Sequence, residues 1–420
     1  MGTAAVGSEL AHAFAADRAA VLGAVLRRTG DLQLAEDAVQ EAFAAALRSW
    51  GRDGVPDDPR GWLTTTAWRK AIDRMRAEGA ARQRAERVGI DRSQETIETV
   101  DVSSAEDDLL VLVLACAHPA LSHQAGTVLT LRSVLDVPTE AIGHLFGVST
   151  AAMAQQIVRA KRKIRQAGIR PAVPEPAEIP ERLTTARSVI HLLLTHGHAA
   201  RRGDTATDLG VLREALWLAR ELHHVVPADD ETRALLALTL FTVARAPARV
   251  AADGSAVLLQ DQDRTRWDHE LIAEGQDLLA SVPPLSAGGS YRLEALIAAE
   301  HCTAPSPEET NWVRLAALHG ALVARLPSPA ARVAHAVAVG EADGPHAGLR
   351  LLAHLATEEE VEDMAIFHAA AGRLLRTAGE AQAADEADRR AREATTNPAH
   401  RTAMLRAARR AQPPARPPTS

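Results

Sequence analysis

The sequence has few aromatic residues, only two cysteines and no long apolar run. Aromatic residues make up 3% of the chain, so alanine, leucine and valine must build the core. Strands favour aromatic and β-branched side chains, so this composition disfavours β-sandwiches and barrels and favours packed helices. Cys116 and Cys302 lie far apart in the sequence, which excludes a disulfide framework.

Signals for export and for membrane insertion are also missing. No apolar stretch reaches the roughly 18 residues of a membrane span, so we expect no membrane partner. The opening residues MGTAAVGSELAHAF lack a basic stretch followed by an apolar segment, which predicts a cytoplasmic protein. The net charge of −7 disfavours a protein that coats nucleic acid, but it allows local basic stripes.

The length and the prolines divide the chain. A chain of 420 residues exceeds one ordinary core and predicts two to three domains. The segment RPAVPEPAEIPE is typical of a stiff linker, and the end QPPARPPTS of a disordered tail. The predicted division is a helical unit at 8–77, a linker at 78–105, a helical unit at 106–168, a proline-rich linker at 169–181, a helical region at 182–410 and a tail at 411–420.

Two amphipathic helices are predicted in the first unit. In DLQLAEDAVQEAFAAALRSW, four apolar residues recur at steps of four, four and three and predict one buried face: Val39, Phe43, Leu47 and Trp50. The opposite face is polar and carries Glu36, Asp37, Gln40 and Glu41. In GWLTTTAWRKAIDRMR, the predicted apolar face consists of Leu63, Ala67, Ala71 and Met75.

The second of these helices also carries a basic stripe. The stripe consists of Arg69, Lys70, Arg74 and Arg76, and it suits contacts to phosphates, with Trp68 available for stacking on unpaired bases. The alternative is a solvated basic face with a half-buried tryptophan, and the residues taken alone favour that alternative.

The second unit has the pattern of a helix-turn-helix. A short helix ends at Gly147, and Ser149 can cap the next helix, whose buried face is predicted to be Met153, Ile157, Ala160 and Ile164. The outer face presents Gln155, Arg159 and Arg162, flanked by Gln156, Lys161, Lys163 and Arg165. Such a helix reads base edges with its first half and holds phosphates with its basic end. Helix pairs of this kind also occur as plain packing units, but the basic cluster favours DNA binding.

Together these segments resemble the extracytoplasmic-function (ECF) sigma factors of the sigma-70 family. The stretch LAEDAVQEAFAAALRSW resembles the core-binding helix of sigma region two, and DPRGWLTTTAWRKAIDRMRAE resembles the −10 helix, although it departs from the family at Trp68 and Arg69. The stretch HPALSHQAGTVLTLRSVLDVPTEAIGHLFGVSTAAMAQQIVRAKRKIRQAG resembles region four. The resemblance implies a region-two helical bundle at 8–77, a region-four helix-turn-helix at 106–168, and core RNA polymerase and promoter DNA as partners.

The resemblance also assigns site residues. The positions that match the polymerase-binding face are Glu36, Asp37, Gln40, Glu41, Phe43 and Leu47. The positions that match the −10 side are Arg60, Thr64, Arg69, Lys70, Arg74 and Arg76. The positions that match the −35 reader are Thr150, Gln155, Gln156, Arg159, Arg162 and Lys163.

The rest of the chain resembles the C-terminal extension of a sigma-factor subgroup, which is related to tetratricopeptide repeats. The stretch LLQDQDRTRWD is the strongest marker of that resemblance. Helical apolar periodicity recurs at 211–226, 233–244, 312–326 and 366–378, with prolines between the segments. Stacked helix pairs explain the alanine excess, so we expect a helical solenoid.

Candidate metal and catalytic residues in this region have a simpler explanation. Three carboxylates fall within Asp261 to Asp268, but we favour a polar loop that caps the following helix, with its Asp and Arg side chains paired. His196 and His198 have no cysteine or carboxylate at zinc-binding spacing. No phosphate loop, GxSxG elbow or HExxH run occurs, so we predict no catalytic residue, no metal and no cofactor.

The sequence therefore predicts a sigma factor that is not an enzyme, whose solenoid regulates it through contact with the two sigma units. Two alternatives stay open. One is a helix-turn-helix regulator whose solenoid senses a ligand or a peptide. The other is an enzyme seated around Asp261 to Asp268, which would require converging carboxylates or histidines.

Overall fold

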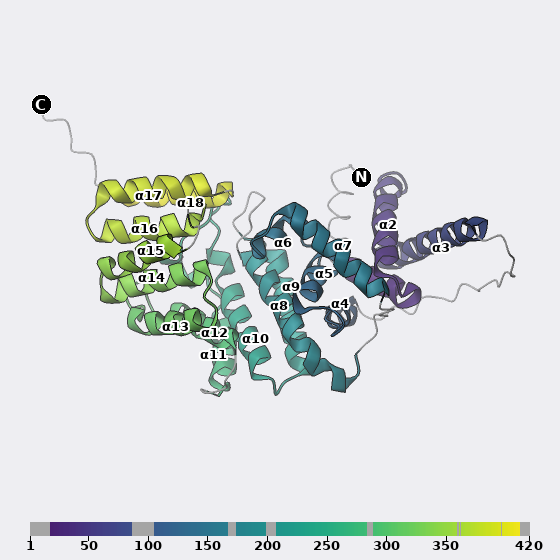
Figure 1. The fold of residues 1–420 in the computed structure, drawn as a ribbon, viewed down its shortest axis with the longest axis horizontal. Coiled ribbons are helices and arrows are strands. Elements are labelled where there is room, and N and C mark those ends of the chain that lie inside the picture. The colour runs from purple at the N-terminus through teal and green to yellow at the C-terminus, as the bar shows by residue number, and fades with distance from the viewer. Residues whose placement is uncertain are drawn as a thin grey trace, which may run out of the picture. The chain divides into compact units, whose positions relative to one another are not determined.

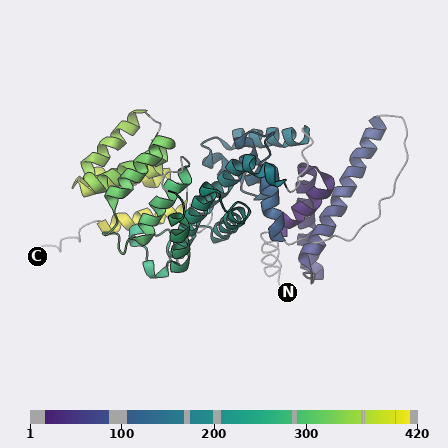
Figure 2. The same cartoon turned by 90° about the horizontal axis from the view of Figure 1, so that it is seen from below.

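The fold is all-helical in the part of the chain that can be described. The computed structural model describes residues 17–85, 105–166, 174–198, 207–283, 289–358, 361, 363–395 and 397–411. Within these ranges, the sole strand-like feature is an isolated antiparallel bridge between Val250 and Ala256. The predicted all-α fold class is confirmed. The chain divides into two compact units, Met1–Val189 and Ile190–Ser420, which Figures 1 and 2 draw from two directions.

The first unit contains both of the regions that resemble sigma segments. Its helices are residues 17–29, α2 (Leu32–Asp53), α3 (Pro59–Ala85), α4 (Ala105–Cys116), α5 (His123–Leu129), the π-helical turn η1 (Thr130–Val134), α6 (Thr139–Leu145), α7 (Thr150–Gln166), the 3-10 turn η2 (Pro176–Glu178) and the first half of α8 (Ile179–His198). Helices α2 and α3 pack along each other (Figure 1). Asp31 begins α2, because its carboxylate accepts hydrogen bonds from the backbone of Gln33 and Leu34.

A buried tryptophan and a buried arginine hold the first unit together. Trp50 is 2% exposed and meets Trp62 edge to face, with ring centroids 5.7 Å apart. Arg18 is 6% exposed, and its guanidinium donates to the carbonyl oxygens of Ser133 at 3.0 Å and Val134 at 2.8 Å. These bonds tie the helix at 17–29 to the end of η1, across more than a hundred residues of sequence.

Two positions on the predicted apolar faces are exposed instead. Leu47 is 59% exposed and Met75 is 38% exposed, so these two assignments to the core are wrong. Alanines complete the buried face of α2 in place of Leu47: Ala35, Ala38, Ala42 and Ala46. The buried face of α2 is therefore formed by these alanines together with the larger apolar residues, and the larger residues alone do not predict it.

The second unit is a chain of helices. Its elements are the end of α8, α9 (Leu209–Val225), α10 (Asp230–Ala244), the 3-10 turns η3 (Ala246–Ala248), η4 (Leu259–Asp261) and η5 (Arg264–Arg266), α11 (His269–Ala280), α12 (Ser290–Thr303), α13 (Trp312–Arg325), α14 (Pro329–Asp343), α15 (Pro345–Glu358), α16 (Ala365–Thr377), α17 (Ala381–Ala394) and α18 (Pro398–Ala411). From α9 onward each helix packs against its neighbours in sequence, as the green-to-yellow helices of Figures 1 and 2 illustrate. The four segments predicted from apolar periodicity correspond to α9, α10, α13 and α16.

Close helix contacts in this unit depend on small residues. A Cβ atom added at Gly348 would lie 2.4 Å from the carbonyl oxygen of Ala336, so α14 and α15 touch backbone to backbone at that point. Leu374 of α16 is fully buried beside them, in a cluster with Val333, Leu352 and Leu355. The alanine excess of the sequence therefore serves helix packing, as predicted.

The boundaries of the elements differ from the predicted linkers at two places. Helix α3 continues to Ala85, into the predicted linker at 78–105, because AEGAARQRA is rich in helix-forming residues. Helix α8 begins at Ile179, and its first half belongs to the first unit. There Arg182 is 5% exposed and donates to the carbonyl oxygen of Leu114 at 2.9 Å. The predicted tail at 411–420 lies almost wholly outside the described residues.

Among the described helices, none is both long enough and apolar enough to cross a membrane.

Candidate functional site

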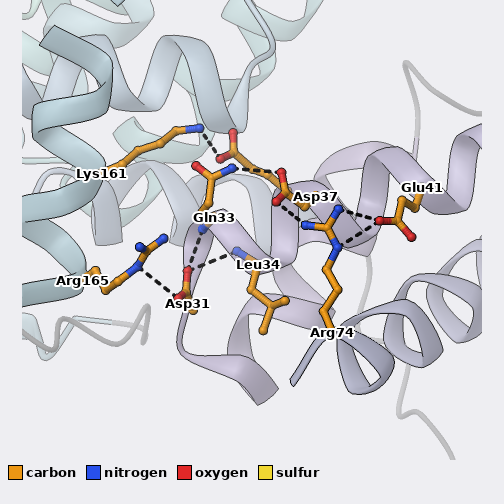
Figure 3. A network of polar contacts seen from close by, with 9 residues as sticks. Asp31, Gln33, Leu34, Asp37, Glu41, Arg74, Lys161 and Arg165 are labelled. Carbon is orange, nitrogen blue, oxygen red and sulfur yellow. Dashed lines mark hydrogen bonds and ion pairs between the residues drawn. The ribbon is translucent and has the colours of Figure 1, made fainter. Parts of the chain in front are cut away.

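The N-terminal end of α2 meets the basic end of α7 (Figure 3). Asp31 caps α2 through one carboxylate oxygen, and its other oxygen lies 3.3 Å from Nε of Arg165. The Arg165 side chain is 58% exposed, so water screens this pair and its contribution to stability is small. Its importance is positional, because it joins two helices that resemble different sigma regions.

A second ion pair between the same helices is much more deeply buried. Nζ of Lys161 lies 2.6 Å from Oε2 of Glu36, and the side chains are 19% and 6% exposed. The contact is an ion pair without the alignment of a good hydrogen bond, and no other donor of the described residues reaches that oxygen. Lys161 is therefore the one group that compensates the buried charge of Glu36 within this part of the chain.

One turn along α2, two more carboxylates hold an arginine of α3 (Figure 3). Nε and Nη2 of Arg74 contact Oε1 of Glu41 at 2.9 and 2.5 Å, and Nη1 contacts Oδ2 of Asp37. These hydrogen bonds raise the pKa of Arg74, chiefly through Glu41. Lys70 lies 3.9 Å from the other oxygen of Glu41. The structure thus joins residues assigned to polymerase binding with residues assigned to the −10 side.

The remaining residues assigned to the −10 side differ in accessibility. Arg69 and Arg76 are exposed on α3. Arg60 is half-buried and its Nε lies 3.1 Å from the carboxylate of Asp17, while Thr64 is 5% exposed and donates its hydroxyl to the carbonyl oxygen of Arg60. Thr64 is therefore a packing residue in this conformation. Trp68 is half-buried under the guanidinium of Arg28, 5.1 Å from its ring centroid, as the alternative interpretation of this helix predicts.

The residues assigned to the polymerase-binding face divide in the same way. Phe43 is 5% exposed and belongs to the core, whereas Leu47 and Gln40 are exposed. Leu47 is a large apolar side chain that faces solvent, and such a residue marks a candidate protein contact. Glu36 is engaged with α7 as described above, so the free part of this face is centred on Leu47.

Helices α6 and α7 have the geometry of a helix-turn-helix. Gly147 has φ +65°, a conformation that L side chains rarely adopt, and it turns the chain between the helices. The Ser149 hydroxyl accepts a hydrogen bond from the backbone of Ala152 at 3.2 Å, so the predicted cap is confirmed. All four predicted core positions of α7 are buried: Met153, Ile157, Ala160 and Ile164.

The outer face of α7 is open to solvent. Five of the residues assigned to the −35 reader are exposed: Thr150, Gln155, Arg159, Arg162 and Lys163. The sixth, Gln156, is half-buried and its side chain lies 3.4 Å from that of Gln124. Val158 is 64% exposed on the same face, next to Gln155 and Arg162 in the helical register. Val158 is not among the residues assigned from the sequence, and its exposed apolar side chain lies outside the predicted buried face of α7.

The contacts of Asp31, Lys161 and Arg165 were not predicted from the sequence. Lys161 and Arg165 appeared as flanks of a DNA-reading face, yet they project toward α2 and not outward. Lys161 and Arg165 are four residues apart on one helix, and this spacing predicts that their side chains share a face. No pattern in the sequence indicates that α2 supplies the matching carboxylates.

The marker stretch in the second unit is a capping loop, as predicted. Asp268 caps α11 by accepting hydrogen bonds from the backbone of Glu270 and Leu271, and Asp263 caps η5 through Thr265. The arginines of this loop donate hydrogen bonds to backbone carbonyl oxygens, and the charge of Arg266 also acts on Asp263 and helps to lower the pKa of its carboxyl. In the described ranges no group of three His, Cys, Asp or Glu side chains is placed to hold a metal ion.

The cysteines and the histidines mostly serve packing. Cys116 is 3% exposed, and burial raises the pKa of its thiol to about 12, so it is not a reactive thiolate. His118 accepts a hydrogen bond from the backbone of Ala120, which agrees with a packing role. His191 contacts Glu294 at 2.8 Å and meets Tyr291 edge to face.

Known protein families match parts of both units. Residues 14–81 match the Sigma-70 region 2 family, and residues 182–282 match a family of unknown function, DUF6596. An uncharacterised protein of Rhizobium meliloti is 35% identical over 384 residues, which are 90% of each chain. No solved structure matches the chain.

Two relatives carry functional names. A probable ECF RNA polymerase sigma factor, SigI of Mycobacterium tuberculosis, is 29% identical over 48% of this chain and 66% of its own length. The ECF RNA polymerase sigma factor SigJ of the same organism is 30% identical over 41% of this chain and 56% of its own length. The chain is therefore similar to Sigma-70 region 2 at residues 14–81 and to ECF sigma factors over part of its length, and it is similar to the Rhizobium meliloti protein along nine tenths of its length.

Proposed function

We propose that this chain is a promoter-specificity subunit that binds core RNA polymerase and promoter DNA and has no active site of its own. One observation carries the proposal: a helix-turn-helix with an exposed row of Gln155, Arg159 and Arg162 lies in the same unit as a sigma-70 region 2 match. Such a subunit acts where RNA polymerase acts, in the cytoplasm, and it leaves the chemistry of RNA synthesis to the polymerase.

Polymerase binding is assigned to the outer face of α2, within the domain proposed at 8–77. Leu47 offers an exposed apolar side chain, and Gln40 and Glu41 supply polar neighbours. Interfaces between proteins are often centred on an apolar residue within a polar rim. Phe43 supports this face from below as a core residue.

Promoter binding is assigned to α7 and to the exposed basic residues of α3. On α7, Arg159 and Gln155 can pair with base edges in the major groove, and Arg162 and Lys163 can hold phosphates. On α3, Arg69 and Arg76 remain open for contacts to the −10 strand. This division supports recognition of the −35 element by the domain proposed at 106–168 and of the −10 element by the domain at 8–77.

In this proposal, ion pairs from α2 to the two DNA-binding helices hold the subunit in a closed form. Lys161 and Arg165 of the proposed reading helix are held by α2, and Arg74 of the proposed −10 helix is held by Asp37 and Glu41. A polymerase surface that binds the α2 carboxylates must exchange these ion pairs, and this exchange would separate α7 from α2. The domain at 182–410, a tetratricopeptide-like solenoid in this proposal, would then shift the balance through contact with the sigma units.

The runner-up function is a helix-turn-helix regulator that senses a ligand in the second unit. An open groove of about 520 Å³ there supports it, with an ion pair of Arg220 and Glu274 at 2.6 Å among its lining residues. His223 and His224 also line the groove. Such a regulator needs no polymerase contact, so the two functions differ in what the exposed face of α2 does.

Capture of core RNA polymerase by the full chain tests the proposal. We compare the unchanged chain with Leu47→Asp and with Val313→Asp, a matched change at an apolar residue that is 70% exposed in the second unit. We expect Leu47→Asp to weaken capture at least tenfold, because it places a charge at the centre of the contact, and Val313→Asp to have no effect. Failure of the unchanged chain to capture polymerase, or equal effects of the two variants, favours the regulator.

A further inference from the structure

Four arginines gather around the end of α10 in the second unit without a carboxylate partner. Arg245 follows α10, Arg249 follows η3, and Arg264 and Arg266 belong to η5. Within the described residues, all four donate to protein oxygens that carry no charge and none forms an ion pair. We call these four residues the arginine cluster.

Arg245 is the most deeply placed member of the cluster. Its side chain belongs to a residue that is 9% exposed, and its Nε donates to the carbonyl oxygen of Phe241 at 3.3 Å. Its two terminal nitrogens make no hydrogen bond and no ion pair to any described residue. Neither terminal nitrogen is among the fully buried atoms that lack a partner, so both reach the surface and are open to a ligand that carries a counter-charge.

The neighbours of Arg245 add positive charge and do not neutralise it. Burial lowers the pKa of Arg249 to about 9 and that of His301 to about 3, and in both cases the charge of Arg245 adds to the shift. The pKa of His198 is lowered as well, first by burial and then by Arg249 and Arg245. These histidines therefore stay neutral at pH 7, and the arginines define the local field.

Two carboxylates whose charge acts on members of the cluster lie in solvent. Asp263 is exposed and its charge acts on Arg266, but the carboxylate is already engaged with the backbone and hydroxyl of Thr265. Glu308 acts on Arg264 and is also fully exposed. Neither carboxylate contacts Arg245, so both leave the terminal nitrogens of that residue unpaired.

The marker stretch LLQDQDRTRWD, which contains η5, holds this arrangement in place. Arg264 donates to the carbonyl oxygens of His301 at 3.1 Å and Ala304 at 2.5 Å, and its guanidinium lies 4.6 Å from the ring centroid of Trp267. Arg266 donates to the carbonyl oxygen of Pro247, in the segment that follows Arg245. The loop thus uses two arginines to lock the end of α10 against α12, and it leaves the guanidinium of Arg245 as the free member.

We propose that Arg245 is an oxyanion-binding residue of the second unit, whose terminal nitrogens take a phosphate or carboxylate group of a small ligand in a two-pronged contact. The planar guanidinium matches the spacing of two oxygens in both groups. The low exposure of Arg245 limits access to a small group, and the field of the cluster favours one that carries negative charge. This site goes beyond the promoter-specificity function and does not depend on it.

Calorimetric titration of the full chain at constant ionic strength tests the site. Inorganic phosphate and acetate are the two probes, and the variant is Arg245→Gln. The control is Arg213→Gln, which removes an exposed arginine of α9 outside the cluster. We expect saturable binding of at least one probe to the unchanged chain and to the control, and an affinity lower by about tenfold or more in Arg245→Gln.

The two probes distinguish the sources of the anionic group. Saturation by phosphate alone assigns a phosphate ligand, and saturation by acetate alone assigns a carboxylate. Arg245→Lys is the second variant, in case Arg245→Gln does not fold, because lysine keeps the positive charge. We expect Arg245→Lys also to bind the probe more weakly than the unchanged chain, because an ammonium group cannot make the two-pronged contact of a guanidinium. Binding that is unchanged in both Arg245 variants, or no saturable heat with either probe, overturns the proposal.

Discussion

The buried ion pair between Lys161 and Glu36 makes a quantitative prediction. We expect Lys161→Met to destabilise the first unit by about 2–3 kcal/mol, because it leaves the Glu36 carboxylate buried without a partner. At 2.6 Å the gross attraction is roughly 6 kcal/mol with an effective dielectric constant of about 20, and desolvation of both groups opposes it. Removal of one partner from a fully buried pair costs about 3–5 kcal/mol, and the 19% exposure of Lys161 reduces that figure here.

The double variant separates the pair from its surroundings. Glu36→Gln combined with Lys161→Met removes both charges, so its stability should lie within about 1 kcal/mol of the unchanged chain. The coupling of the two changes then measures the pair itself. Lys163→Met is the control, because Lys163 is exposed on the same helix.

Hydrogen exchange of the α2 amides, measured by mass spectrometry on the full chain, is the assay. Loss of the pair should speed exchange in α2, and in α7 where it faces α2, by about thirtyfold or more for 2 kcal/mol. A change in Lys161→Met no larger than in Lys163→Met would refute the reasoning, because the charge of Glu36 would then have another compensation.

Three further predictions concern packing, capping and pH. Gly348→Ala should destabilise the second unit by about 1–3 kcal/mol in thermal unfolding, since the new methyl would lie 2.4 Å from the carbonyl oxygen of Ala336. Asp268→Ala should cost about 1 kcal/mol in urea unfolding, because it removes the cap of α11. Burial, with the charge of Arg245, lowers the pKa of His301 from 6.5 to about 3. Below pH 6.5 the unfolded chain therefore binds a proton at His301 that the folded chain excludes. The free energy of unfolding decreases by about 1.4 kcal/mol for each unit by which the pH is lowered from 6.5 to 3. His301→Gln should lose about 2 kcal/mol less than the unchanged chain when urea unfolding is compared at about pH 7 and pH 5.

Each of these changes has a matched control in the chain. Gly51→Ala lies in α2 where an added Cβ meets nothing within 4 Å, so it should not destabilise, and equal losses at both glycines would contradict the contact at Gly348. Asp277→Ala removes an exposed carboxylate of α11 away from its first turn, and it should cost less than Asp268→Ala. His269→Gln, at an exposed histidine, should leave the acid sensitivity as it is; the same acid sensitivity in His301→Gln would refute the burial argument.

Local sequence rules predicted the helix-turn-helix closely. Ser149 caps α7 and the four apolar positions of that helix are buried, because both features depend on residues within a few turns of one another. The same rules placed Leu47 in the core and were wrong there. Alanines can form a buried face as well as leucine can, so the spacing of the larger apolar residues alone does not decide which face of α2 is buried.

The polar contacts of the site could not be predicted from the sequence. Glu36 and Lys161 are separated by more than a hundred residues, and their pairing depends on the packing of two whole helices. The arginines near Asp263 were expected to pair with the aspartates beside them, yet capping engages Asp263 and leaves Arg264 to distant carbonyl oxygens. The order of charged residues along the sequence therefore does not predict which groups their side chains contact.

Run-off transcription with purified core RNA polymerase tests the central claim most directly. The template set includes genomic fragments and the region upstream of the chain's own gene, and the full-length chain is compared with Arg159→Ala. We predict defined transcripts that appear only when the chain is added and that weaken in Arg159→Ala, because that arginine is exposed on the proposed reading face. Absence of any transcript that depends on the chain, together with no capture of core polymerase, would contradict the claim that this protein directs promoter recognition.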